Sequence, residues 1–207
     1  MNKWFVFTLI VCLTDCILPF ILACFYPGYS HMNMVLSSLG SERSQVRTVF
    51  NIWMACLGVS FIFIGIHLFV TYKGMNPIAS TILLIITISY AVFDCIISSL
   101  FSVGDSKEMV TIAEKIHGYG SAIGCTLFVF AGLLAVILVW RRNVAVGRLL
   151  LVNFILSFIV FIIFIAGENI PQDSTGVLKL MSYEGLWQRI SFVFMYIPYI
   201  VLMRLES

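Results

Sequence analysis

The chain has 207 residues, of which 61% are hydrophobic and 11% are charged, and its formal net charge at pH 7 is +2. Its mean hydropathy of +1.05 lies far outside the range of soluble globular domains. The composition therefore excludes a soluble globular protein and predicts an integral membrane protein. The small net charge indicates no nucleic-acid partner.

Apolar runs long enough to cross a bilayer follow one another along the chain, since a hydrocarbon core of about 30 Å takes about 20 helical residues. They cover approximately residues 4–25, 49–72, 78–101, 118–140, 144–167 and 186–205. Because lipid offers no hydrogen-bond partner to backbone groups, each run is expected to be a helix. The sequence predicts an all-α fold, a polytopic transmembrane bundle of six helices that forms a single integral membrane domain over residues 1–207.

An even number of spans places both termini on the same side of the membrane. The connections on that side are short turns with basic residues, above all Arg141 and Arg142, and almost no acidic residue. Lysine and arginine are equally frequent on the other side, but there they are mixed with acids. By the positive-inside rule, this distribution predicts a multi-pass protein of the plasma membrane with both termini in the cytoplasm.

The first loop on the outward side, residues 26–44, is dense in polar and turn-forming residues. Ser30 is placed to cap a short helix, and Gly40 to close it in a left-handed conformation. Along this helix Ser30, Asn33 and Ser37 fall on one face and apolar residues on another. We expect a short interfacial helix, which either lies at the membrane surface or turns its polar face toward a pocket.

Polar residues also gather where the other spans meet the outward side. Arg189 lies a turn or more inside the sixth span, where an arginine needs a partner, and Asp94 or an anionic ligand is a candidate. We expect these residues to converge on an outward-facing pocket at headgroup depth. The predicted ligand-binding residues are Ser30, Asn33, Ser37, Asn51, Asp94, Glu184 and Arg189.

Two histidines and an aspartate of the outward side form a predicted catalytic constellation. His31 or His117 has the chemistry of a general base, with Asp105 to orient it. The same three side chains are acceptable zinc ligands, but no fixed spacing such as HExxH supports a metal site, so none is predicted. The sequence identifies no cofactor.

Two further titratable residues lie within the predicted spans. For Asp15, a carboxyl group bonded to a neighbouring helix competes with membership of a proton or cation pathway, and the isolation of this acid favours the first. His67 falls near the inner end of the second span, where its imidazole reaches the interface, which indicates a structural role.

Short motifs extend over essentially the whole chain: Pro27-Gly28-Tyr29-Ser30-His31, Ser37-Ser38-Leu39-Gly40 before Asn51, Gly104-Asp105, His117, Glu184-Gly185-Leu186 and Gln188-Arg189-Ile190. Together they resemble the prokaryotic domain-of-unknown-function family 998. The resemblance implies a multi-spanning prokaryotic membrane protein, and it implies no particular activity.

The position of the pocket at headgroup depth predicts a membrane lipid or a lipid-like molecule as its ligand. Two alternatives stay open. One is an intramembrane hydrolase or transferase that acts on a lipid through His and Asp residues, with or without a metal. The other is a non-catalytic immunity or regulatory subunit with a membrane-protein partner. A small transporter, which would need Asp15 and Asp94 on one water-accessible path, ranks below these.

Overall fold

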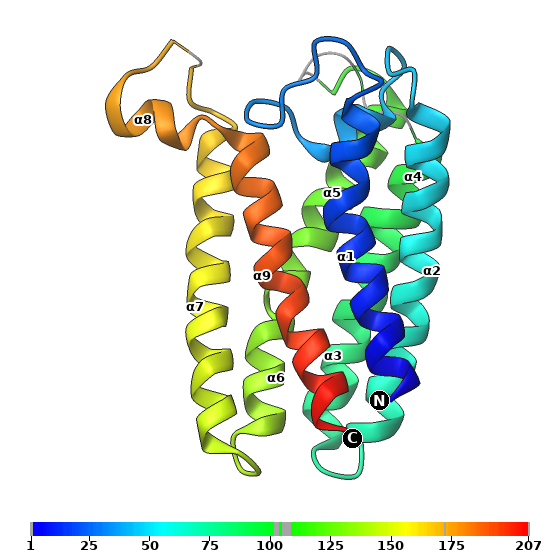
Figure 1. Cartoon of the computed structure of the whole chain (residues 1–207), viewed down its shortest axis with the longest axis vertical. Helices are drawn as coiled ribbons and strands as arrows, with labels where there is room; N and C mark the ends of the chain where they lie inside the picture. The colour runs from blue at the N-terminus through cyan, green and yellow to red at the C-terminus, as the bar shows by residue number, and fades with distance from the viewer. Residues whose placement is uncertain (1, 102–103, 105–108, 172, 207) are drawn as a thin grey trace.

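The computed structural model describes residues 2–101, 104, 109–171 and 173–206. Six helices long and apolar enough to span a membrane form one bundle (Figure 1): α1 (Lys3–Ala23), α2 (Arg47–Tyr72), a third span (Pro77–Leu100), a fourth span (Ile112–Val139), α7 (Val144–Gly167) and α9 (Glu184–Leu205). The predicted all-α fold with six spans is confirmed. Two short segments, the 3-10 helix η1 (Leu36–Gly40) and α8 (Gly176–Met181), lie at one end of the bundle, which we call the loop end.

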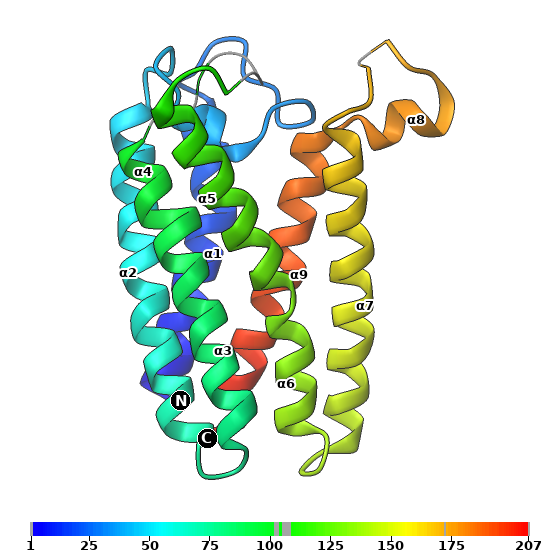
Figure 2. The same ribbon diagram turned by 180° about the vertical axis from the view of Figure 1, so that it is seen from behind.

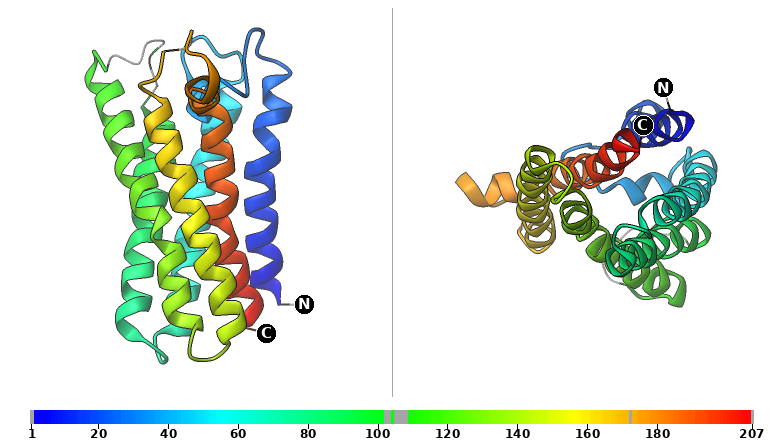
Figure 3. Two further views of the ribbon diagram at one scale, coloured as in Figure 1. Left: turned by 90° about the vertical axis from the view of Figure 1, so that its left-hand side faces the viewer. Right: turned by 90° about the horizontal axis from the view of Figure 1, so that it is seen from below.

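Both chain termini lie at the end opposite the loop end (Figures 1 and 3). A small polar cluster joins them there. The Glu206 carboxylate accepts hydrogen bonds from Asn2 (3.3 Å) and Thr71 (2.8 Å), and His67 Nε2 lies 2.9 Å from one of its oxygens. His67 therefore has a structural partner near the terminal end of α2.

The largest difference from the predicted boundaries is at the fourth span, which begins at Ile112 rather than at 118. The Thr111 hydroxyl accepts a hydrogen bond from the Glu114 backbone N–H (3.2 Å), and Glu114 Oε2 accepts one from the Thr111 N–H (2.6 Å). Such a capping box stabilises a helix start ahead of the apolar run. A boundary drawn from hydropathy misses this turn.

The third and fourth spans are interrupted within their length. The third consists of α3 (Pro77–Ser89), a π-helical segment η2 (Tyr90–Ile97) and α4 (Ser98–Leu100). The fourth consists of α5 (Ile112–Val129) and α6 (Ala131–Val139), which meet at Phe130. π-helical turns are rare and occur frequently at functional sites. The apolar pattern of the sequence predicted neither interruption.

Glycines hold η2 tightly against its neighbours. A Cβ placed on Gly58 of α2 would lie 2.6 Å from a backbone carbonyl oxygen of η2, and one on Gly124 of α5 would lie 2.8 Å from Asp94 Cβ. Gly120 of α5 makes a similar approach to the η2 backbone, at 3.1 Å. Small residues at such contacts allow helix backbones to approach closely in membranes. The π-helical segment is therefore fixed between α2 and α5.

An aromatic cluster packs beside η2. It consists of the buried side chains Phe61, Tyr90, Phe128, Tyr196 and Tyr199. The rings of Tyr90 and Phe128 are stacked with centroids 3.8 Å apart. The hydroxyls of Tyr90 and Tyr196 bond each other (3.0 Å), and that of Tyr199 bonds a threonine of α3 (2.7 Å). Since an unpaired hydroxyl is costly in a membrane interior, this pairing allows the tyrosines to serve as core residues.

We predict that Gly124→Ala destabilises the bundle, because the added methyl group would collide with the backbone and side chain of Asp94. Overpacking of this kind typically costs about 1–3 kcal/mol. The measurement is the midpoint of thermal unfolding of the purified protein, followed by tryptophan fluorescence. Gly74→Ala is the matched control, since a Cβ there meets nothing within 4 Å. Equal midpoints for the two variants would contradict the prediction.

Candidate functional site

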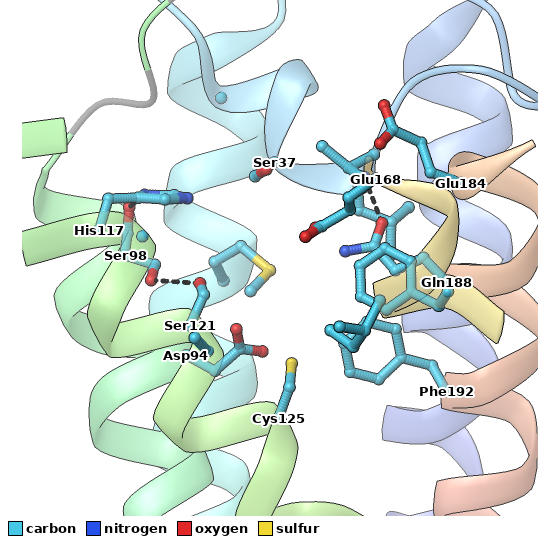
Figure 4. A pocket seen from close by; sticks show the side chains of 18 of the residues that line it. Ser37, Asp94, Ser98, His117, Ser121, Cys125, Glu168, Glu184, Gln188 and Phe192 are labelled. Atoms are coloured by element: carbon cyan, nitrogen blue, oxygen red, sulfur yellow. Dashed lines mark hydrogen bonds between the residues drawn. The ribbon is translucent and has the colours of Figure 1, made fainter. Parts of the chain in front are cut away.

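A cavity of about 470 Å³ lies in the loop-end half of the bundle (Figure 4). Segments η1, α2, η2, α5, α7 and α9 all contribute to its lining. The volume falls within the range of about 300–1,000 Å³ that is typical of small-ligand sites. One part of the wall is aromatic, with Tyr90, Phe161, Phe164 and Phe192, and the rest carries many polar side chains.

Several residues selected from the sequence line this cavity together. They come from different elements: Ser37 from η1, Asn51 from α2, Asp94 from η2, His117 from α5 and Glu184 from α9. Segments far apart in the sequence thus meet at one cavity, as the sequence led us to expect. The role of these residues in binding stays a prediction.

The remaining selected residues are placed differently. Asp105 falls outside the part of the chain that the structure describes. Among the described residues, the cavity lining does not include Ser30, His31, Asn33 and Arg189. Of the two described members of the predicted catalytic constellation, His117 lies at the cavity and His31 does not. Within the described ranges, no group of three His, Cys, Asp or Glu side chains is close enough to hold a metal ion.

The first loop contains less helix than expected. Ser30 caps a turn, in which its hydroxyl accepts a hydrogen bond from the Asn33 N–H (3.3 Å), and the chain becomes extended before η1 begins. The helical face expected for Ser30, Asn33 and Ser37 is therefore wrong. Gly40 ends η1 without a left-handed φ. Its lack of a side chain instead allows close packing, because a Cβ there would collide with Asn51 Oδ1.

Arg189 fixes this loop onto the start of α9. Its Nη1 donates to the carbonyl oxygens of His31 (3.0 Å), Met34 (3.1 Å) and Gly185 (2.6 Å), and its Nη2 donates to the Tyr29 hydroxyl. Among the described residues, no acid pairs with Arg189: carbonyl oxygens and a hydroxyl accept from its terminal nitrogens, while its buried Nε has no hydrogen-bond partner there. The planar group with its several donors suits this multiple contact.

Other contacts of α9 reinforce the same joint, which we call the loop joint. Gln188 Oε1 accepts a hydrogen bond from the Leu36 N–H (2.7 Å), and the Leu186 N–H donates to the Met32 carbonyl (3.2 Å). A Cβ at Gly185 would collide with carbonyl oxygens of the loop, so glycine permits the approach. The motifs at 27–31 and 184–190 therefore belong to one contact, which holds η1 against the cavity.

His31 belongs to the loop joint. Its ring stacks on Phe20 with centroids 4.5 Å apart and meets Tyr29 edge-on at 5.2 Å. Partial burial lowers the pKa of the His31 imidazole below its ordinary 6.5, and the positive charge of Arg189 lowers it further. Burial also raises the pKa of Tyr29, which keeps its hydroxyl protonated beside Arg189. The loop joint therefore favours a neutral His31.

His117 is only 7% exposed and turns its ring into the cavity (Figure 4). Its Nδ1 lies 3.1 Å from the Ser98 carbonyl oxygen and 2.9 Å from that of Phe101. Because carbonyl oxygens only accept hydrogen bonds, this pattern assigns the proton of the neutral ring to Nδ1. Nε2 is then an acceptor, and no hydrogen bond from a described residue reaches it.

Asp94 reaches into the same cavity from η2 and is 6% exposed (Figure 4). Its nearest polar neighbours are the Ser121 hydroxyl and the Cys125 thiol, and Ser121 bonds Ser98 at 3.0 Å. These neighbours are neutral. Among the described residues, neither Lys nor Arg forms an ion pair with Asp94.

Asp15 borders the cavity as well. Its carboxylate accepts hydrogen bonds from Trp53 Nε1 of α2 (2.8 Å) and from the Tyr196 hydroxyl of α9 (2.7 Å). It is thus bonded to neighbouring helices, in agreement with the structural interpretation. Asp15 and Asp94 share one cavity, so the surroundings of these two acids do not exclude a transport path.

The cavity is more acidic than the sequence suggested. Glu114 and Glu168 line it in addition to Asp15, Asp94 and Glu184, and none of the described lining residues is Lys or Arg. Sequence reasoning missed the two additional acids. Glu114 belongs to the capping box of α5 and Glu168 caps the end of α7. The sequence signal that could have identified Glu114 and Glu168 is their position at the ends of spans on the outward side.

We predict that Arg189→Lys loosens the loop joint, because a compact ammonium group cannot reach three carbonyl oxygens and a hydroxyl at once. Hydrogen–deuterium exchange should show protection of the Leu36 and Leu186 amides falling by about tenfold, the equivalent of one lost charged hydrogen bond. Arg148→Lys, on an exposed position of α7, is the control. Unchanged protection in Arg189→Lys would show that the guanidinium does not hold the loop.

We predict that His31 titrates below pH 6.5 in the folded protein. Its pKa is lower in the folded than in the unfolded chain, so its favourable contribution is complete above pH 6.5. This contribution is lost as the pH falls through the folded-state pKa. NMR titration of the imidazole measures the midpoint. Arg189→Gln should raise it, because a positive neighbour is removed, and a wild-type midpoint at or above 6.5 would refute this account.

The chain matches one known family of proteins. No curated protein and no solved structure matches the chain. A family model described as "Protein of unknown function (DUF998)" matches residues 9–205, which include the motifs at 27–31 and 184–190. Because the match extends over nearly the whole chain, this multi-spanning membrane protein belongs to the DUF998 family.

Proposed function

We propose that this protein binds an amphipathic, lipid-like molecule in the cavity, and that the molecule enters from the membrane between α5 and α7. The observation that carries the proposal is the border of the cavity. Ala122 of α5 and Ile165 of α7 both line the cavity and both are exposed, Ile165 by 39%. Both lie within helices long enough to span a membrane.

The arrangement of the helices supports this entrance. Seen from behind, α5 and α7 diverge toward the loop end, and α9 is visible between them (Figure 2). The cavity is lined from all three of these helices. A cavity that reaches the surface at this position opens toward lipid rather than only toward water, so a ligand dissolved in the bilayer has direct access.

The wall chemistry supports an amphipathic ligand. Phe161, Phe164 and Phe192 offer apolar surface to a hydrocarbon chain, while Asp94 and His117 offer polar contacts to a headgroup. Ligand sites commonly combine a largely apolar wall with a few polar groups that fix orientation. A wholly apolar molecule would leave the polar groups of this cavity unpaired.

We further propose that the protein resides in the plasma membrane with its termini in the cytoplasm. The terminal end carries the basic turn around Arg141 and Arg142, which supports this orientation by the positive-inside rule. The cavity would then open to the outer leaflet.

A second candidate function is hydrolysis or group transfer on the bound lipid. It is favoured by His117, whose Nε2 accepts no hydrogen bond from a described residue and, in the neutral ring, has the form of a general base at the cavity wall. His31 has no part in this candidate, because it belongs to the loop joint. His117→Gln would abolish turnover at saturating lipid if His117 is the base, and would leave the saturated rate unchanged if it only binds.

We predict that Ala122→Trp reduces lipid retention, because an indole at the border fills the entrance. After extraction in a mild detergent, native mass spectrometry should show a lipid adduct on the wild-type protein and at least about a threefold smaller adduct fraction on the variant, given the tight steric limits of such cavities. Ile123→Trp is the matched control, since Ile123 neighbours Ala122, is 50% exposed and is not among the described lining residues. Equal retention in both variants, or no retained lipid in the wild type, would overturn the proposal.

A further inference from the structure

We infer that the headgroup bound in this cavity is a cation. It is an ammonium group that pairs with Asp94 and is oriented by a hydrogen bond to His117. The inference rests on the proposed function, because it presupposes that an amphiphile occupies the cavity. It goes further by assigning the charge of the ligand and the residues that recognise this charge.

The first argument is the missing partner of Asp94. The Asp94 side chain is only 6% exposed, and its described polar neighbours are a serine hydroxyl and a cysteine thiol. A carboxylate within a membrane span is costly unless a positive group compensates it. None of the described lining residues is Lys or Arg. An ammonium group in the cavity would supply the positive charge.

The second argument is the orientation of His117. Its Nδ1 is engaged by two carbonyl oxygens, so Nε2 presents a lone pair to the cavity. An ammonium group donates hydrogen bonds and accepts none, and the neutral form of this ring accepts at Nε2. Both side chains that carry the inference therefore require a donor from the ligand.

The third argument is the character of the surrounding wall. Glu168 and Glu184 stand across the cavity from Asp94 (Figure 4), and both also have contacts within the protein. They add acidic groups to the wall, and the inference does not need them as direct partners. Tyr90 and Phe192 line the same space, and the faces of aromatic rings attract ammonium groups.

A phosphate or carboxylate headgroup fits this wall poorly. It would face Asp94 and the glutamates, and like charges at such distances in a poorly hydrated site repel strongly. Arg189, the arginine expected to bind an anion, uses its terminal nitrogens as hydrogen-bond donors within the loop joint. The ammonium group can belong to an aminolipid of the bilayer or to a free long-chain amine, and the chemistry recognised is the same.

The test compares three probes with one chain length and different headgroups: dodecylamine, dodecyl phosphate and dodecanol. The full-length protein in detergent is titrated with each, and the bound fraction is read by native mass spectrometry. Dodecylamine should bind at least about tenfold more tightly than dodecyl phosphate, the ratio expected for one charge-assisted hydrogen bond. This comparison needs no variant, so a misfolded mutant cannot decide it.

A variant locates the effect. Asp94→Asn keeps the shape of the side chain and removes its charge, and it should weaken dodecylamine binding by about tenfold while changing dodecanol binding by less than about twofold. Glu206→Gln removes a carboxylate at the terminal end, outside the described cavity lining, and should change neither. His117→Gln provides a second variant that should weaken only the amine.

The outcomes separate this inference from the proposed function. Equal binding of all three probes, or tighter binding of dodecyl phosphate, overturns the cationic assignment and leaves an amphiphile site in place. Unchanged dodecylamine binding in Asp94→Asn also overturns the assignment. Binding of none of the probes overturns both proposals. Enrichment of phosphatidylethanolamine over phosphatidylglycerol on the purified protein supports a bilayer aminolipid as the source, and binding of dodecylamine without such enrichment supports a free amine.

Discussion

The close contact of η2 with α2 and α5 is the constraint on which the loop-end half of this protein depends. In lipid, a helix that departs from the α form must still satisfy its backbone groups within the protein. The Ser98 hydroxyl meets part of this need by donating to the Phe93 carbonyl oxygen (3.0 Å). Gly58, Gly120 and Gly124 allow the neighbouring backbones to enclose the segment. The π-helical turn can persist because it is enclosed, and it directs Asp94 to the cavity.

The loop joint is the second requirement for the cavity. It adds polar contacts to the packing of Leu39 against Leu22 and Phe50, which by itself anchors only η1, a single short 3-10 helix with no side-chain cap. Arg189 and Gln188 hold the loop through its backbone, and Gly185 provides the room. The most polar motifs of the sequence thus serve mainly to build one wall of the cavity. Their side chains act on each other and on carbonyl oxygens.

The electrostatic character of the cavity follows from where the charges lie. None of the basic residues of the described outward segments lines the cavity, and Arg189 belongs to the loop joint, whereas acidic side chains from α1, η2, α5 and α9 border the cavity. Low polarizability around these groups strengthens any interaction with a bound charge. The same surroundings make an uncompensated carboxylate expensive, which is why the cavity favours a cationic occupant.

The sequence alone determined the class and outline of this protein. Six apolar runs of span length, and the rule that lipid leaves no backbone group unpaired, were sufficient to predict an all-α bundle of six helices with both termini at one end. Asn51, Asp94, His117 and Glu184 were selectable because each is polar near the end of, or within, an apolar run, and Ser37 because it lies in the polar first loop. Hydropathy carries this information because it records the solvent of each segment.

Only the tertiary structure decided which polar residues share a space. Arg189 and His31 joined the loop joint rather than the cavity, and Glu114 and Glu168 joined the cavity without having been selected. The π-helical turn and the break at Phe130 left no trace in the apolar pattern. The physical reason is that these features depend on contacts between segments distant in the chain, above all on backbone carbonyl oxygens and glycine approaches. A linear pattern of side chains does not encode such contacts in readable form.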